Sequence, residues 1–277
     1  MERFGPWDSR LIEQKQSGPL SALTVNEGFV DWPAEFQNSF RLRSETNNPP
    51  LHSVSVLASL LQQRGVSVGG IDVGIAPAIT VTVASVESPP LTETITHINS
   101  YSSNIGAELL LKEIAFASGG TGSTADGSQV VARYLGEQGV PMANVIVNDG
   151  SGLAESGRLT CQALTAILID GGFQSPLGAS LSIASTRGSL ADRYVDTPLA
   201  GQVFAKTGSL RTVRALSGFV QSEVDPEAQV VFSYIANDEA ISNDEVLEVQ
   251  ESFVRDLARY PMGPPVEALV PAEPVAN

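Results

Sequence analysis

The spacing of apolar residues predicts helices through the middle of the chain. From Leu51 to Arg64 the apolar residues recur at positions i, i+3 and i+4, the spacing of one helix face, and Gly65 ends the pattern. The same reasoning predicts a helical region at 92–117 with a polar break at 99–104, and further helices at 126–138, 159–169 and 245–260. The last of these is amphipathic.

Runs of β-branched residues between turn residues predict strands on either side of these helices. Short runs lie at 20–25, 66–74, 79–86 and 143–147. In the last third, residues 201–205, 213–221 and 229–235 read as a three-stranded antiparallel meander. Strands at both ends with helices clustered between them predict an α+β fold, in which helices cover an antiparallel sheet.

Composition excludes several classes of partner and cofactor. Sixteen basic against thirty-one acidic residues give a formal charge of −15, so a polyanion such as nucleic acid or an anionic membrane would be repelled. Two isolated histidines and the single Cys161 predict no metal site and no intrachain disulfide, and we expect no cofactor. The first ten residues do not resemble a secretory signal, and no apolar run approaches the roughly 20 residues that span a bilayer.

The tetrad Lys206-Thr207-Gly208-Ser209 follows a predicted strand. On an edge strand it would place an ammonium, hydroxyls and an unobstructed backbone along one groove, where a peptide ending in a carboxylate could bind as an added strand. A strand end followed by an ordinary turn is the alternative, because short motifs of this kind also arise by chance.

The triplet Ser102-Ser103-Asn104 lies in the polar break before a predicted helix. The hydroxyl of Ser102 could relay a proton, and the amide of Asn104 could donate to a substrate carbonyl and hold a neighbouring lysine. The alternative is a helix N-cap, for which Ser and Asn are strongly preferred.

Ser-x-Asn followed about a hundred residues later by Lys-Thr-Gly is the order found in penicillin-binding proteins and class A β-lactamases. Together with the surrounding segments, the two motifs resemble the class C low-molecular-mass penicillin-binding proteins, over roughly residues 17–260. The matching segments are Val83–Leu91, Ser102–Leu110, Asp149–Leu153, Gly188–Arg193, Thr197–Gly201, Ala205–Gly208 and Leu216–Val220.

The resemblance implies a β-lactamase/transpeptidase-like fold and a serine-type D-Ala-D-Ala carboxypeptidase/endopeptidase. Its partners would be peptidoglycan stem peptides ending in D-Ala-D-Ala, with β-lactams as inhibitors, in the periplasm or another extracytoplasmic compartment. Ser102 and Asn104 match the family's second motif and Lys206, Thr207 and Gly208 its third, while Ser209 would help to hold the terminal carboxylate. Such enzymes form an acyl-enzyme on a serine that an adjacent lysine activates.

The sequence departs from the family in one decisive respect. Its lysines are Lys15, Lys112 and Lys206, and none follows a serine by three positions, so no Ser-x-x-Lys nucleophile motif is present. Ser103 also stands where the family usually has Asp or Asn. We therefore expect a chain shortened at its N-terminus, with an incomplete domain and exposed apolar surface. A catalytically inactive binding module for D-Ala-D-Ala peptides is the alternative.

On this interpretation the chain divides into three parts. Residues 1–50 are the remnant of a preceding inserted domain with a connecting strand, 51–260 the C-terminal part of the peptidase domain, and 261–277 a disordered proline-rich tail.

One further residue and one further segment carry no chemistry in this interpretation. Cys161 is a small core residue, and residues 149–152 form a turn, because the Gly-x-Ser-x-Gly spacing of a nucleophile elbow is not met.

Overall fold

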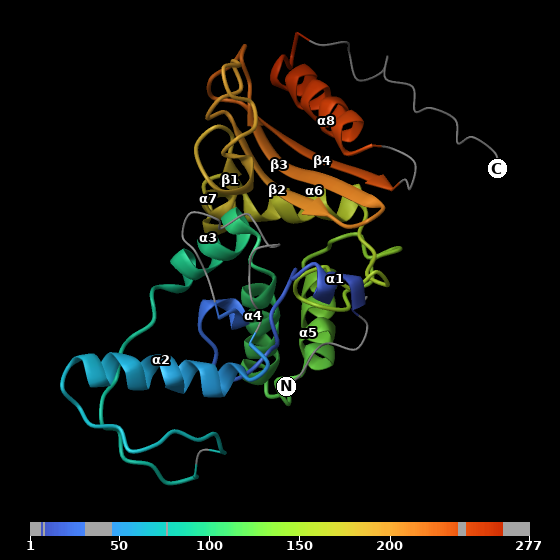
Figure 1. The fold of residues 1–277 in the computed structure, drawn as a ribbon. Coiled ribbons are helices and arrows are strands. Elements are labelled where there is room, and N and C mark those ends of the chain that lie inside the picture. The colour runs from blue at the N-terminus through green and yellow to red at the C-terminus, as the bar shows by residue number, and fades with distance from the viewer. Residues whose placement is uncertain (1–6, 8, 31–45, 76, 238–241, 263–277) are drawn as a thin grey trace. The chain divides into compact units, whose positions relative to one another are not determined.

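The structure is a computed structural model of the 277-residue chain and describes residues 7, 9–30, 46–75, 77–237 and 242–262. The chain divides into two compact units, Met1–Leu159 and Thr160–Asn277, and each is described by itself (Figure 1). The division at residues 50 and 260 that the sequence suggests stays a prediction. Within the described residues, no helix is long and apolar enough to cross a bilayer.

The first unit is helical. Its elements are α1 (Ser9–Glu13), the short 3-10 helix η1 (Asn26–Gly28), α2 (Pro49–Gln63), α3 (Leu91–Tyr101), α4 (Asn104–Ala117) and α5 (Thr124–Glu137). Helices α4 and α5 pack closely because Gly127 lies against Leu111, where an added Cβ would come within 2.4 Å of a backbone oxygen. The predicted helices at 51–64 and 126–138 are confirmed, and so is the break that separates α3 from α4.

Four predicted strands of this unit are wrong. Residues 20–25, 66–74 and 79–86 form no strand, and 143–147 contributes only a bridge between Ile146 and Arg158. In the segment 79–86, Ile79, Val83 and Val86 are 91%, 95% and 96% exposed. The reason is that a β-branched run becomes a strand only when a partner strand satisfies its backbone, and the described residues offer none here.

The second unit contains an antiparallel sheet in the order β1-β2-β3-β4. Its elements are α6 (Cys161–Gly171), α7 (Pro176–Ser180), β1 (Ser182–Ile183), the 3-10 helix η4 (Gly188–Leu190), β2 (Val203–Ser209), β3 (Val213–Gln221), β4 (Gln229–Asn237) and α8 (Asn243–Ala258). The predicted meander is confirmed as β2, β3 and β4, and the predicted helices at 159–169 and 245–260 are confirmed as α6 and α8. Strand β1 was not predicted, because two residues carry no alternation.

Helices cover both faces of this sheet (Figure 1). On one face Val203, Ala205 and Leu216 pack with Val254 and Ala258 of α8. The opposite face of the sheet contributes Phe219 and Phe204, which pack with Leu168 of α6. The predicted α+β fold is therefore confirmed. The predicted disordered tail falls largely on residues 263–277, outside the described part of the chain.

Candidate functional site

The Ser-Ser-Asn triplet forms the junction between α3 and α4. Ser102 ends α3 in a left-handed conformation, with φ 57° and ψ 48°. Ser103 is the N-cap of α4, and its Oγ accepts a hydrogen bond from the amide of Gly106 at 3.2 Å. The N-cap considered as an alternative is thus present, but Ser103 supplies it. Ser102 and Asn104 flank this cap residue in sequence.

Two contacts tie this junction to the N-terminal segment. The Oγ of Ser103 donates to Glu27 Oε1 at 2.5 Å, and the same carboxylate oxygen lies 3.5 Å from Nε2 of His97. The amide Nδ2 of Asn104 donates to the backbone oxygen of Gln16 at 2.6 Å. The triplet is therefore held in one conformation by groups far from it in sequence.

A buried carboxylate lies one turn further along α4. Glu108 is fully buried, and its Oε1 accepts from the amides of Gly150 at 3.0 Å and Ser151 at 2.8 Å. Burial raises the pKa of this carboxyl, and the nearby Asp149 raises it further. The predicted turn at 149–152 is confirmed, since Asp149 Oδ1 accepts from the amide of Gly152 at 2.8 Å. Sequence reasoning missed Glu108, which reads as one residue of an amphipathic helix.

The Lys-Thr-Gly-Ser tetrad forms the end of β2. Strand β1 pairs with β2 only at Phe204 and Ala205, so the β1 side of residues 206–209 is not covered by a strand in the described chain. On the other side β3 pairs with the whole tetrad. Gly208 and Ser209 are exposed, and a Cβ on Gly208 would meet only Ala215 Cβ, at 3.3 Å. The prediction of an edge strand therefore applies to the last four residues of β2, because β1 covers the preceding part. An unpaired strand edge is the kind of surface to which an extended peptide can add, so this remains the predicted binding edge.

Lys206 is a desolvated ammonium at this edge. Burial lowers the pKa of Lys206 from 10.5 to about 8, because the low-dielectric surroundings disfavour its charged form. Its Nζ donates to the backbone oxygen of Thr207 at 2.8 Å. A cation in such surroundings attracts a carboxylate more strongly than one in water, because its field is less screened.

The hydroxyl of Thr207 begins a row of three hydroxyls that extends to Ser189 and Ser182. Thr207 Oγ1 donates to Ser189 Oγ at 2.9 Å, and Ser189 Oγ lies 3.0 Å from Ser182 Oγ. The amide of Ser189 also donates to Ser182 Oγ, at 3.2 Å. Sequence reasoning did not identify Ser182 or Ser189 as site residues. The only signal was the segment Gly188–Arg193, one of those that carry the family resemblance.

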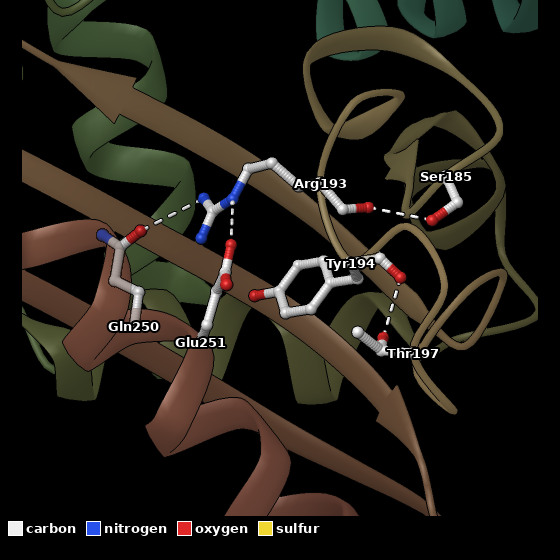
Figure 2. A network of polar contacts seen from close by, with 6 residues as sticks. All are labelled: Ser185, Arg193, Tyr194, Thr197, Gln250 and Glu251. Atoms are coloured by element: carbon white, nitrogen blue, oxygen red, sulfur yellow. Dashed lines mark hydrogen bonds and ion pairs between the residues drawn. The ribbon is translucent and has the colours of Figure 1, made fainter. Parts of the chain in front are cut away.

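The loop that carries Ser189 is fixed to α8 by Arg193 (Figure 2). Its guanidinium donates to Gln250 Oε1 at 3.2 Å and to Glu251 Oε1 at 3.4 Å, and its backbone oxygen accepts from Ser185 Oγ at 2.9 Å. Gln250 is buried, and the guanidinium lies 5.2 Å from the Tyr194 ring centroid. Because hydrogen bonds to a charged group are strong, this network keeps the loop in place.

The predicted site residues are thus divided between the two units. Ser102 and Asn104 lie together in the first unit, and Lys206, Thr207, Gly208 and Ser209 lie together in the second. Cys161, expected in the core, is only partly buried, because it occupies the first position of α6 at the end of the helix. Among the described residues, no three His, Cys, Asp or Glu side chains are grouped so that they could hold a metal ion.

Comparison with known proteins identifies the family. The family described as D-Ala-D-Ala carboxypeptidase 3 (S13) matches residues 14–260 of this chain. The chain belongs to the S13 family. This match includes both motifs and every segment on which the resemblance was based, so the predicted family is confirmed.

Individual members of the S13 family give the extent of the similarity. The chain is 33% identical over 213 residues to a D-alanyl-D-alanine carboxypeptidase of Actinomadura sp., covering 72% of this chain and 38% of that protein. It is 29% identical over 241 residues to carboxypeptidase DacB of Mycolicibacterium smegmatis, covering 83% and 50%. The chain therefore spans at most about half the length of these two S13 relatives.

A solved S13-like structure confirms the fold. Penicillin-binding protein 4 (DacB) of Haemophilus influenzae, in complex with a β-lactam, superimposes with a TM-score of 0.66 at 23% identity, covering 79% of this chain and 53% of that one. At this level of identity the similarity establishes the fold. The predicted transpeptidase-like α+β architecture is thus confirmed.

Proposed function

We propose that this chain is the part of an extracytoplasmic serine-type D-Ala-D-Ala carboxypeptidase/endopeptidase that binds the C-terminal end of a peptidoglycan stem peptide. The observation that supports this most directly is the open side of β2 beside the partly desolvated ammonium of Lys206. The peptide would add to β2 as a further strand, with main-chain hydrogen bonds along residues 206–209. Its terminal carboxylate would bind Lys206, Thr207 and Ser209.

The family resemblance gives the second motif roles of its own in catalysis. Ser102 would relay a proton toward the leaving amine, and Asn104 would donate to the peptide carbonyl. Gly208 would let the substrate backbone approach β2, since it adds no side chain on that edge. In an enzyme with a serine nucleophile, these groups would orient the scissile peptide bond and transfer protons, and the acyl-enzyme would form on that serine.

A second function, a binding module without catalysis, is supported by one specific observation. No serine of this chain precedes a lysine by three positions, so the activated nucleophile of the family has no counterpart in these 277 residues. Such a chain would recognise D-Ala-D-Ala peptides and β-lactams reversibly. Positioning groups without an attacking group do not form a covalent intermediate.

Binding of a D-Ala-D-Ala peptide to the purified chain tests the site. We expect isothermal calorimetry to show binding of the acid peptide and at least a tenfold loss in Lys206→Met, because a charge-assisted contact is removed. Lys112→Met, at a lysine of α4 outside the tetrad, serves as the matched control and should bind like the unchanged chain. Equal affinities for all three proteins would contradict the proposed site.

Mass spectrometry after incubation with a penicillin separates the two functions. The binding module predicts an unchanged mass and full release of the penicillin on dialysis. An increase in mass by one penicillin would show that the chain carries a competent nucleophile, and would favour the enzyme.

A further inference from the structure

The hydroxyl of Thr207 is hydrogen-bonded to a side chain of another element. Its Oγ1 donates to Ser189 Oγ, which is 3.0 Å from the hydroxyl of the fully buried Ser182. Threonine is β-branched, so its rotamer decides whether the hydroxyl or the methyl group points to a given side. The hydrogen bond to Ser189 selects that rotamer.

Sheet topology shows on which side of β2 this hydroxyl lies. Ser182 belongs to β1, and η4, which carries Ser189, contacts β1 and β2. Because β1 is the neighbour of β2 at the open edge, the bond to Ser189 draws the Thr207 hydroxyl toward that edge. A peptide strand added beyond the end of β1 would meet the hydroxyl there.

The support for Ser189 is itself rigid. Its backbone amide is fixed to Ser182 Oγ at 3.2 Å, and the following Leu190 is fully buried in the core beneath α8. Further along the same loop, Arg193 binds Gln250 and Glu251 of α8 (Figure 2). Ser189 therefore holds a fixed position relative to β2, as a group that orients a binding residue must.

We propose that Ser189, supported by Ser182, is a positioning residue that holds the Thr207 hydroxyl at the binding edge. When a ligand binds, Thr207 turns its single proton from Ser189 Oγ to the terminal carboxylate, and Ser189 Oγ donates its own proton to Thr207 Oγ1 in return. This inference rests on the proposed function of the tetrad. It adds a specificity determinant, because the effect of Ser189 applies to ligands that end in a free carboxylate and passes through Thr207.

Two peptides and a double-mutant cycle test this inference. We expect Ser189→Ala to weaken binding of a peptide ending in D-Ala-D-Ala about fivefold, with little change for its C-terminal amide, because one oriented hydrogen bond is lost. Ser189→Thr, which retains a hydroxyl, should bind within about twofold of the unchanged chain. In a Thr207→Val background Ser189→Ala should have no further effect, because the group that it orients is absent.

Each outcome has a definite meaning. Equal weakening for acid and amide peptides, or an undiminished effect of Ser189→Ala in the Thr207→Val background, would overturn the positioning role. If the unchanged chain binds the acid peptide and Ser189→Ala binds it equally well, this inference fails while the proposed function stands. No binding by the unchanged chain overturns both. Ser189→Cys keeps the volume with a weak donor and replaces the alanine variant if that variant does not fold.

Discussion

At the scale of single residues, Lys206 couples the binding edge to pH. The folded chain releases the Lys206 proton near pH 8, whereas the unfolded chain keeps it to about pH 10.5. Between pH 8 and pH 10.5 the unfolded state binds more protons at Lys206 than the folded state does. The free energy of unfolding therefore rises with pH over this range. Below pH 8 the burial of the charged amine opposes folding by up to about 3 kcal/mol.

Comparison with Lys206→Met tests this linkage. The methionine variant should be more stable than the unchanged chain at pH 7, and the difference should narrow as pH rises from 8 to 10.5. Urea unfolding of both proteins across this range measures the difference directly. A difference that is constant with pH would show that Lys206 is not desolvated.

Glu108 gives the opposite pH dependence. The pKa of the Glu108 carboxyl in the folded chain is raised above its ordinary value of 4.5. The contribution of this residue to the free energy of unfolding is therefore fully present below pH 4.5, and it is lost as the pH rises through the raised pKa. Glu108→Gln keeps an oxygen for the amides of Gly150 and Ser151. We expect thermal unfolding from pH 4.5 to 7 to show the unchanged chain losing stability relative to Glu108→Gln, and parallel curves would contradict this.

Site residues can be predicted from the sequence when they belong to a recognisable motif. Residues that only the tertiary fold brings to the site are missed. The Lys206 tetrad and the Ser102 triplet were identified because their residue types and order are specific. Ser189 and Ser182 were not, because a serine seven residues from another has no local signature, and only the pairing of β1 with β2 brings them to Thr207.

At the scale of elements, two glycines of the sheet differ in the space that they leave for a side chain. A Cβ on Gly218 of β3 would lie 2.0 Å from the backbone oxygen of Phe204, so Gly218→Ala forces β2 and β3 apart. Gly208 meets only a side-chain carbon at 3.3 Å. We expect Gly218→Ala to lower stability by several kcal/mol and Gly208→Ala to fold normally.

Chemical denaturation and peptide binding distinguish the two variants. Gly208→Ala should retain the unfolding midpoint of the unchanged chain but bind the peptide more weakly, because its methyl group obstructs the edge of β2. If Gly208→Ala binds the peptide as tightly as the unchanged chain, the peptide does not approach this edge.

Helices were predictable here because the apolar period of a helix and the residues that cap it lie in one continuous segment. Asn48 caps α2 in this way, and Ser242 caps α8. Strands depend on partners elsewhere. The alternation in β3 and β4 coincided with real neighbours, whereas the β-branched run from Ile79 to Val86 had none among the described residues. The same local pattern therefore gave a correct and an incorrect prediction.

At the scale of the whole molecule, apolar surface is exposed in a strongly charged chain. Ile79, Val81, Val83 and Val86 are each at least 87% exposed, although the formal charge of −15 favours solubility. We expect a dye such as anilinonaphthalene sulfonate to bind the native chain. The triple variant Val81→Thr, Val83→Thr and Val86→Thr should reduce its fluorescence, and an unaffected signal would place the dye elsewhere.

The order of strands also bears on how the second unit folds. Every strand pair joins neighbours in sequence, so contact order within the sheet is low and its hairpins can form quickly. The core above them, however, requires Val254 and Ala258 of α8. Docking of α8 is therefore the step that closes this core, and until then the hairpins expose an apolar face that chaperones would recognise.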